Sequence, residues 1–350
     1  MKRRLLIAVP LLALVALTAW FFRPKHEYLG EAYVSEKSVT LWSSLAQVRQ
    51  PLGMLHYGDR VDTLVKHNDF VKVRTAAGTV GWVDNRLLMD PSLWQRSEKL
   101  LQRAASLPVQ GSGRTKVATN LKIDPGRTAP RLYQFGRGVP VQIVGRATAD
   151  WVQVSDDKEP ADPAGTKKED WYLVRGLATR PPSETTARAN MTTASDPGDQ
   201  SVPIAGWVIA RFLELDVPDA VREGAAAANL RPIAWFELNK VDDPSGSKAQ
   251  YLLAATRGAE GQTCDFSVLR VYTWNRKKSR YETAFIENDL CGELPIRLAT
   301  TAAGQPEFRF FTTDDSNHER VYRLIQTVVR RIRQDNETAR AVKPGRKKGH

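Results

Sequence analysis

The chain has 350 residues, of which 42% are hydrophobic and 26% are charged, and its formal net charge is +12. The positive surplus lies at the two ends, because residues 1–30 carry a net +4, residues 320–350 carry a net +8, and the residues between them are neutral as a set. A nucleic-acid-binding domain carries such a surplus on its folded body, so this distribution argues against DNA or RNA as a partner.

The first 29 residues are predicted to be a membrane anchor or a signal segment. The basic start MKRR precedes an uncharged run, Leu5–Phe22. As a helix this run is about 27 Å long, close to the thickness of the hydrocarbon core of a bilayer. Ala16 and Thr18 form a poor signal-peptidase site, and Trp20–Phe22 extend the apolar run beyond it, which favours an uncleaved anchor over cleavage. Either alternative places the rest of the chain outside the cytoplasmic membrane.

Residues 30–90 are predicted to form a small β domain. Four segments are rich in β-branched and aromatic residues and are separated by turn residues: AYVSEKSVTLW, RVDTLVK, FVKVRT and TVGWVDNRLL. Residues 91–112 are predicted to be a helical linker. Asp90-Pro91 is a typical helix start and leucines follow at helical spacing, so a helix is expected from Pro91 to Ala105.

Residues 113–216 repeat the order of the first β domain. YGDRVDTLV corresponds to FGRGVPVQIV, Phe70–Val73 corresponds to Trp151–Val154, and each copy ends with Gly-Trp-Val. Such self-similarity indicates two copies of one structural unit. The second copy contains a long insertion. Its residues 178–203 are rich in Ser, Thr, Pro, Asp and Ala and are predicted to be disordered.

Both copies resemble the bacterial SH3 (SH3b) family. In that family a glycine turn precedes a strand, an aromatic-x-x-Val strand follows, and Gly-Trp-Val opens the last strand. The residues that carry the resemblance are Gly58-Asp59, Phe70–Val73 and Gly81–Val83 in the first copy, and Gly136, Trp151–Val154 and Gly206–Val208 in the second. The resemblance implies two small SH3-like barrels in an all-β protein, and it suggests peptidoglycan or a peptide of an envelope protein as the ligand.

The two Gly-Trp-Val motifs are predicted to contribute to the barrel cores. Trp82 and Val83 in the first copy, like Trp207 and Val208 in the second, are expected to face inward, since one indole can dominate the small core of such a barrel. The alternative is that the tryptophans are platforms on which a ligand stacks. The glycines are assigned to turns, or to a hairpin or bulge that needs a residue without Cβ: Gly58, Gly81, Gly136 and Gly206.

Residues 217–335 are predicted to form a C-terminal antiparallel β domain, a meandering sheet that follows a short helix near Pro218. Residues 336–350 form a basic tail, either a solvated end or a contact for anionic polymer or lipid. The whole arrangement resembles uncharacterised SH3b proteins of the cell envelope. Cys264 and Cys291 are the only cysteines. Outside the cytoplasm they favour a disulfide, worth about 3 kcal/mol in the chain-entropy model, over two separate buried thiols.

The sequence carries no strong catalytic or metal-binding pattern. His56, His67 and His318 do not pair at the spacing of zinc ligands, and motifs such as Gly-x-Ser-x-Gly are absent. One enzyme alternative is a cell-wall cysteine peptidase of the NlpC/P60 type, with Cys264 followed by His318. Such a cysteine lies at a helix N-terminus, whereas TCDFSVLRVYTW is typical of a strand.

We therefore expect a membrane-anchored or secreted protein without catalytic, metal or cofactor sites. Its predicted function is binding or scaffolding at the cell envelope. The membrane is contacted through Leu5–Phe22, and the ligand is peptidoglycan or an envelope protein.

Overall fold

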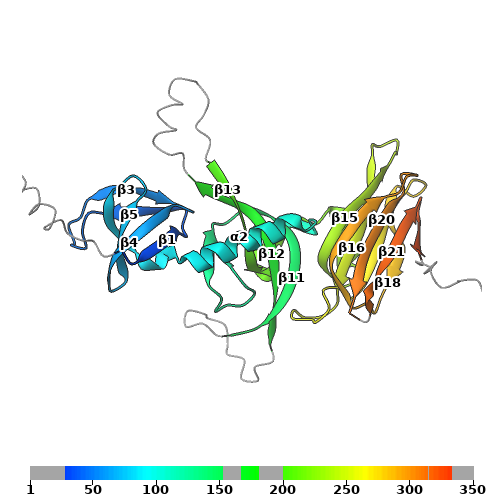
Figure 1. The fold of residues 1–350 in the computed structure, drawn as a ribbon. Helices are drawn as coiled ribbons and strands as arrows, with labels where there is room; N and C mark the ends of the chain where they lie inside the picture. Colours follow the sequence, from blue (N-terminus) through cyan, green and yellow to red (C-terminus); the bar gives the residue numbers. More distant parts are fainter. Residues whose placement is uncertain (1–27, 153–166, 181–199, 314, 333–350) are drawn as a thin grey trace, which may run out of the picture. The chain divides into compact units, whose positions relative to one another are not determined.

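The computed structural model describes residues 28–152, 167–180, 200–313 and 315–332 (Figure 1). These residues form an all-β protein in which the strands pair antiparallel. The chain divides into two compact units. The first consists of Met1–Trp94 with Thr179–Gln200, and the second of Gln95–Ala178 with Ser201–His350.

The first unit contains a seven-stranded sheet in the order β3-β2-β6-β5-β4-β1-β7. Its strands are β1 (Gly30–Val34), β2 (Ser38–Trp42), β3 (Pro51–His56), β4 (Arg60–His67), β5 (Phe70–Thr75), β6 (Val80–Asp84) and β7 (Leu88–Met89), with the 3-10 helix η1 (Asn85–Leu87) between the last two. One face of the sheet supplies a core of aliphatic side chains, most of them valines, which are Ala32, Val34, Val39, Leu41, Leu55, Val61, Val71, Val73 and Val83. Trp94 belongs to this unit and stacks on Tyr33 with 4.8 Å between ring centroids.

The helix α2 (Pro91–Ser106) is close to the predicted bounds, and its residues from Gln95 onward belong to the second unit. Asp90 caps it, because its carboxylate accepts a hydrogen bond of 2.9 Å from the Leu93 N–H. A second seven-stranded sheet follows, in the order β10-β9-β13-β12-β11-β8-β14. Its elements are β8 (Gly111–Thr115), β9 (Thr119–Lys122), β10 (Arg131–Phe135), β11 (Pro140–Asp150), β12 (Lys168–Arg180), β13 (Gln200–Ile209), η2 (Ala210–Phe212) and β14 (Leu213–Leu215).

The two seven-stranded sheets are copies of one arrangement, because each strand of the second sheet occupies the position of the strand seven numbers lower in the first. A register shift occurs at the same place in both, between Thr63 and Val65 of β4 and between Ile143 and Gly145 of β11. The internal repeat that the sequence indicates is therefore present in the strand order.

One correspondence drawn from the sequence is wrong. Trp151–Val154 is not the counterpart of Phe70–Val73, since Trp151 and Val152 lie beyond the end of β11 and outside any strand. The counterpart of β5 is β12, which contains DWYLVRG and pairs with β11 along a long hairpin. The predicted disordered insertion, 178–203, is also too long at both ends, because β12 continues to Arg180 and β13 begins at Gln200. The remainder, 181–199, lies outside the described residues.

The C-terminal domain contains two four-stranded meanders instead of the single meandering sheet expected from the sequence. After helix α4 (Asp219–Ala226), the first consists of β15 (Arg231–Val241), β16 (Lys248–Thr256), β17 (Val268–Asn275) and β18 (Arg280–Glu287). The second consists of β19 (Gly292–Thr300), β20 (Pro306–Thr312), β21 (Asp315–Ile325) and β22 (Val328–Ile332). A shared core joins the two sheets, with Phe236, Leu252 and Val271 from the first and Phe308, Phe310 and Tyr322 from the second.

Within the part of the chain that the structure describes, no helix has the length and apolar character needed to cross a membrane. The predicted anchor, Leu5–Phe22, and the basic tail, 336–350, both lie outside the described residues.

Candidate functional site

The two tryptophans of the repeated motif lie on the face of their strand opposite to the buried valine of the same motif. In β6, Gly81 and Val83 are buried and Trp82 between them is half-buried. Because successive residues of a strand point to opposite faces, the core position belongs to Val83, and the expectation that Trp82 faces inward is wrong. β13 shows the same alternation, with Val208 fully buried and Trp207 half-buried.

The glycines of the motif explain this orientation. A Cβ added to Gly81 would lie 2.6 Å from Leu41 Cγ and 2.7 Å from the Trp42 carbonyl oxygen. A Cβ added to Gly206 would lie 2.5 Å from Leu121 Cγ and 2.8 Å from the Lys122 carbonyl oxygen. The core therefore has no room for a side chain at either position, and the reason is the close approach of a neighbouring strand, not a hairpin or a bulge.

The turn glycines correspond differently from the sequence-based assignment. Gly58 has a φ of +83° and donates its N–H to the carbonyl of Val34. In the second copy Gly138, with a φ of +78°, donates to the carbonyl of Thr115. Gly138 is thus the counterpart of Gly58, whereas Gly136 has no left-handed conformation and no atom near its missing Cβ.

Trp82 is part of a continuous row of side chains on the outer face of the first sheet. Directly opposite residues on neighbouring strands share a face. Lys72 lies opposite Trp82 and Val65 lies opposite Lys72. On the other side Trp42 lies opposite Trp82. The row therefore extends over four strands, from β4 through β5 and β6 to β2.

Further apolar and cationic groups surround this row. The Arg49 guanidinium lies over the Trp42 ring, 4.2 Å from its centroid. Met54 lies opposite Thr40, on the same face as Trp42, and is 51% exposed, while Val48 beside Arg49 is 92% exposed. We call Trp42, Arg49, Met54, Val65, Lys72 and Trp82 the tryptophan face. Exposed apolar side chains gathered with cations in this way are typical of an interaction surface.

The equivalent face of the second sheet is covered by the chain itself. Leu173 and Ala205 are buried there, and Trp207 packs against the same cluster. The covering side chains come from helix α2 and the residue that follows it, and they are Leu100, Leu101, Ala104 and Leu107. Figure 1 shows α2 crossing the strands β11 and β12. The same face of the same scaffold is therefore closed in the second copy, while in the first copy it carries exposed apolar side chains.

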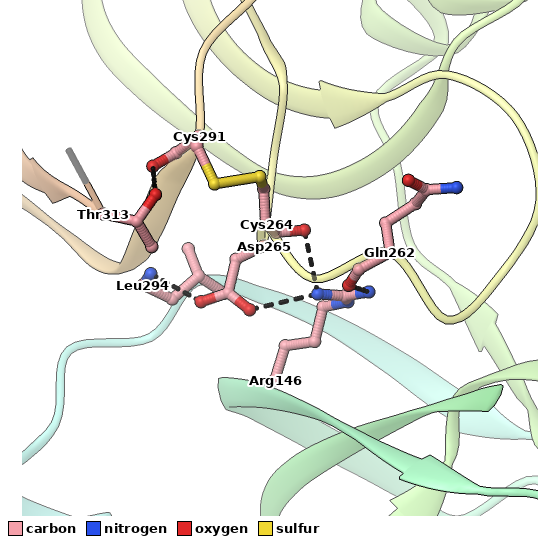
Figure 2. The surroundings of a disulfide bond; sticks show 7 residues. All are labelled: Arg146, Gln262, Cys264, Asp265, Cys291, Leu294 and Thr313. Atoms are coloured by element: carbon pink, nitrogen blue, oxygen red, sulfur yellow. Dashed lines mark hydrogen bonds and ion pairs between the residues drawn. A yellow bond between two sulfur atoms is a disulfide. The ribbon is translucent and has the colours of Figure 1, made fainter.

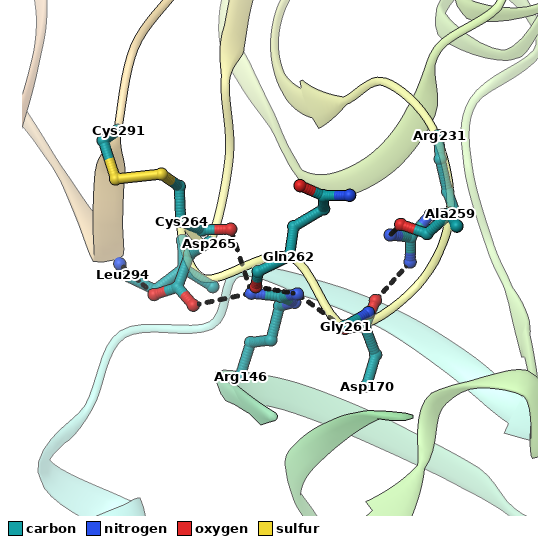
Figure 3. Close-up of polar contacts among 10 residues, drawn as sticks. All are labelled: Arg146, Asp170, Arg231, Ala259, Gly261, Gln262, Cys264, Asp265, Cys291 and Leu294. Atoms are coloured by element: carbon teal, nitrogen blue, oxygen red, sulfur yellow. Dashed lines mark hydrogen bonds and ion pairs between the residues drawn. A yellow bond between two sulfur atoms is a disulfide. The ribbon is translucent and has the colours of Figure 1, made fainter. Parts of the chain in front are cut away.

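A buried polar cluster lies where β11 and β12 meet the C-terminal domain. Arg146 donates hydrogen bonds to the carbonyl oxygens of Gln262 and Cys264, at 2.9 and 3.1 Å, and to the Asp265 carboxylate at 3.1 Å (Figures 2 and 3). It also forms an ion pair of 2.5 Å with Asp170. These contacts fix the loop that carries Cys264 against the second sheet.

Asp170 joins three segments of the second unit. Its carboxylate accepts hydrogen bonds from Arg146, from Arg231 and from the Gly261 N–H, the last at 3.0 Å (Figure 3). Burial raises the pKa of the Asp170 carboxyl, but the two arginines and the Gly261 N–H outweigh it and hold the pKa below the ordinary value. For Asp265, burial dominates and raises the pKa. The ion pairs of Asp170 with Arg146 and Arg231 therefore connect the strands and the loop of this cluster, and we assign the cluster a structural role.

Cys264 and Cys291 form a disulfide, with Cα atoms 4.8 Å apart (Figure 2). The two cysteines are the only ones in the chain, so no free thiol is present in this state. A cysteine peptidase needs the thiolate, and Cys264 cannot supply one while it is bonded. Cys264 also lies in a loop before β17 and not at a helix N-terminus. His318 lies in β21.

A cleft beside this cluster is lined partly by charged side chains, among them Lys116, Glu214 and Glu260. It measures about 630 Å³, and its lining includes Tyr172, Arg211 and Arg231. Arg211 is ion-paired with Glu169 and Arg231 with Asp170. Burial raises the pKa of Tyr172 to about 12, so this phenol stays protonated at neutral pH. Across the described residues, no group of three or more His, Cys, Asp or Glu side chains could hold a metal ion.

Sequence reasoning did not identify Trp42, Arg49 or Lys72 as a surface, nor Arg146 and Asp170 as an ion pair. A signal for the first existed in the alternation around Trp82, because Gly81 and Val83 suit a core face whose neighbours are crowded. The second had no local signal, since the partners of Arg146 lie up to 119 residues away in the chain.

No family model and no curated protein matches the chain. Two solved structures can be compared with it. The structure of NlpC1 from Trichomonas vaginalis is 10% identical, with 74% of this chain and 88% of that chain covered and a TM-score of 0.16. An NlpC/P60 family protein from Bacillus cereus is 11% identical, with 74% and 94% covered and a TM-score of 0.21. At these TM-scores the aligned residues do not superpose as one fold, and we assign neither fold nor function from them.

Proposed function

We propose that this protein is a non-catalytic binding or scaffolding protein of the cell envelope, and that its two seven-stranded sheets are SH3b-like modules. The observation that carries the proposal is the contrast between the two copies. They share strand order, register shift and a glycine that packs against the neighbouring strand. In the second copy Trp207 packs against leucines of α2, whereas in the first copy Met54 and Val65, in the row around Trp82, are exposed. A scaffold that is repeated with one face left open is suited to ligand binding.

The ligand of the proposed module is peptidoglycan or a peptide segment of an envelope protein, and it docks on the tryptophan face. Two half-buried indoles offer rigid apolar contact area at low entropic cost, and Arg49 and Lys72 supply charge for orientation. We further propose that Leu5–Phe22 anchors the chain, with the folded part outside the cytoplasmic membrane. The disulfide supports this location, because disulfides persist in oxidising compartments.

The binding proposal is tested with purified sacculi and the full-length chain in detergent. Sedimentation with sacculi, without release of soluble peptide fragments, is the expected result. Trp82→Ala should reduce the bound fraction at least fivefold, and Ile286→Ala, which removes another exposed apolar side chain from β18, should leave it unchanged. Release of peptide fragments by the wild-type chain would instead establish a cell-wall peptidase and overturn the proposal.

The location is tested by fractionating cells that express the chain. The full-length protein should stay with the membrane after a high-salt wash, and a form that lacks residues 1–29 should be soluble. In spheroplasts, an added protease should degrade the folded part of the full-length chain. Protection of the folded part until the membrane is broken would contradict the proposed orientation.

A further inference from the structure

We infer that the tryptophan face of the first sheet binds an amphipathic helix of a partner protein, and that carboxylates flank the apolar side of that helix. This inference deepens the proposed function, because it names the partner chemistry of the same face. It rests on the covered face of the second sheet, which shows what this scaffold binds when the occupant is present.

Positions on the two faces correspond one to one through the strand pairing. Trp207 lies opposite Lys122, as Trp82 lies opposite Trp42. Leu173 pairs with Gly145, the first partner after the register shift in β11, and Lys72 pairs with Val65, the first partner after the register shift in β4. The occupant of the second face is a helix, with apolar residues spaced i, i+1, i+4 and i+7 along about two turns.

One polar contact of the covering helix also has a counterpart. Arg175 of β12 donates a hydrogen bond of 3.2 Å to the carbonyl of Ala105, in the last turn of α2. A cation in that place satisfies a free carbonyl and interacts favourably with the helix dipole. In the strand register Arg175 lies opposite Gln142, and Arg74 lies opposite Asp62 at the corresponding position of the first sheet. Arg74 therefore stands where a bound helix would present its C-terminal carbonyls.

Charge separates the two faces and defines the partner. Leu173 in the second copy is replaced by Lys72 in the first, and Lys122 is replaced by Trp42, over which Arg49 places a further cation. Other arginines engage the carboxylates on this face, Arg60 with Glu31 and Asp62 and Arg86 with Asp84, and in the described ranges no ion pair engages Arg49, Lys72 or Arg74. A helix with the basic flanks of α2 would be repelled here, whereas a helix flanked by Asp or Glu would be attracted.

The inference is tested with two synthetic peptides and the full-length chain. The first peptide has the sequence of residues 91–108 of this chain, which contains the apolar side of α2 with Arg96, Lys99 and Arg103 on its flanks. The second replaces those three residues by Glu. Affinity is measured by anisotropy of a dye on each peptide, and helix content by circular dichroism, because an isolated peptide of this length is only marginally helical.

We expect the acidic peptide to bind at least tenfold more tightly than the basic peptide and to gain helix content on binding. Trp82→Ala should weaken the acidic peptide at least tenfold. Lys72→Glu should weaken binding of the acidic peptide and strengthen binding of the basic peptide, so that the preference for the acidic peptide narrows or reverses. Lys240→Glu, a charge reversal at a side chain that is 60% exposed in the C-terminal domain, should change neither affinity. The melting temperature of each variant shows whether it is folded.

Any of the following outcomes would overturn the inference. One is equal binding of the two peptides, and another is binding without a gain of helix content. The third is binding of vesicles of phosphatidylglycerol that depends on Trp82 while neither peptide binds, which would identify a lipid surface as the occupant. Sacculi that still sediment the protein in a Trp82-dependent way, without peptide binding, would leave the proposed function standing and remove only this inference. Loss of sacculus binding and peptide binding together would reject both.

Discussion

Arg146 and Asp170 form an ion pair of 2.5 Å in which the two side chains are 1% and 0% exposed. They come from the neighbouring strands β11 and β12, which extend as a hairpin beyond the rest of the second sheet. Two buried charges are stable only where further hydrogen bonds satisfy them, and here Arg231 and the loop around Gln262 supply those bonds. The pair therefore makes the C-terminal domain and the second sheet depend on each other.

Replacing Arg146 should be strongly destabilising, because it leaves Asp170 buried with one cation fewer. We expect Arg146→Met to lower the free energy of unfolding by about 3–5 kcal/mol, as when one partner is removed from a buried ion pair. Urea unfolding followed by circular dichroism measures it. The matched control is Arg114→Met, which breaks an exposed pair with Asp216 and should cost less than about 1 kcal/mol. A similar loss of unfolding free energy in the two variants would show that the buried pair stabilises the fold no more than the exposed pair does.

The repeated glycines lead to a prediction for both copies. Gly81→Ala and Gly206→Ala each force a methyl group to within 2.6 Å of a leucine side chain, so each should lower the free energy of unfolding by about 1–3 kcal/mol. Gly136→Ala is the control, because nothing lies within 4 Å of its added Cβ, and it should change stability by less than about 0.5 kcal/mol. Thermal unfolding of the three variants decides the matter, and a harmless Gly81→Ala would contradict the proposed crowding.

The motif Gly-Trp-Val shows how far the sequence could predict this fold. Its repetition indicated two related β units, and the strand orders agree with that. It could not show which side of the strand faces the core, because hydrophobicity favours Trp82 and only the crowding of Gly81 against Leu41 decides for Val83. The alternation of Gly81, Trp82 and Val83 is compatible with either orientation, and the crowding that decides between them depends on a strand about 40 residues away.

The second sheet shows a different limit. Trp151 has the aromatic-x-x-Val pattern of the expected strand, but the real strand begins at Lys168 and pairs with β11, whereas in the first copy β5 begins at Phe70, shortly after β4 ends at His67. Pattern matching alone could not choose between two aromatic segments in one insertion. The open face was likewise hidden, since Lys72 reads as an ordinary exposed residue of a strand until its counterpart, Leu173, is seen beneath α2.

Reduction of the disulfide should destabilise the C-terminal domain. The bond closes a loop of 27 positions, which in the chain-entropy model contributes about 3 kcal/mol. A dithiol reductant should therefore lower the free energy of unfolding of the wild-type chain by about that amount. It should also speed hydrogen exchange in residues 257–267, where Arg146 finds its carbonyl acceptors.

The control for this experiment is the variant in which Cys264 and Cys291 are both replaced by alanine. It should start at the lower stability and respond to the reductant with no further change. A thiol titration of the native, non-reduced wild-type chain should detect no free thiol. A reactive thiol in that titration would contradict the structural role of Cys264 and reopen the peptidase alternative.

Acid should weaken the junction through Asp170. The pKa of this carboxyl lies below its ordinary value of 3.8, since Arg146, Arg231 and the Gly261 N–H outweigh the effect of burial. A group with a lowered pKa in the folded state stabilises the fold above its unfolded pKa, and the contribution is lost as the pH falls through the folded value. The stability difference between the wild type and Asp170→Asn should therefore be largest near pH 6 and should shrink as the pH falls below about 3.8.

Asp219→Asn, which removes a carboxylate that is 84% exposed, serves as the control for general charge effects. Urea unfolding at pH 6, 5, 4 and 3 measures both differences, and a constant difference for Asp170→Asn across this range would show that its carboxylate is not the group that senses acid.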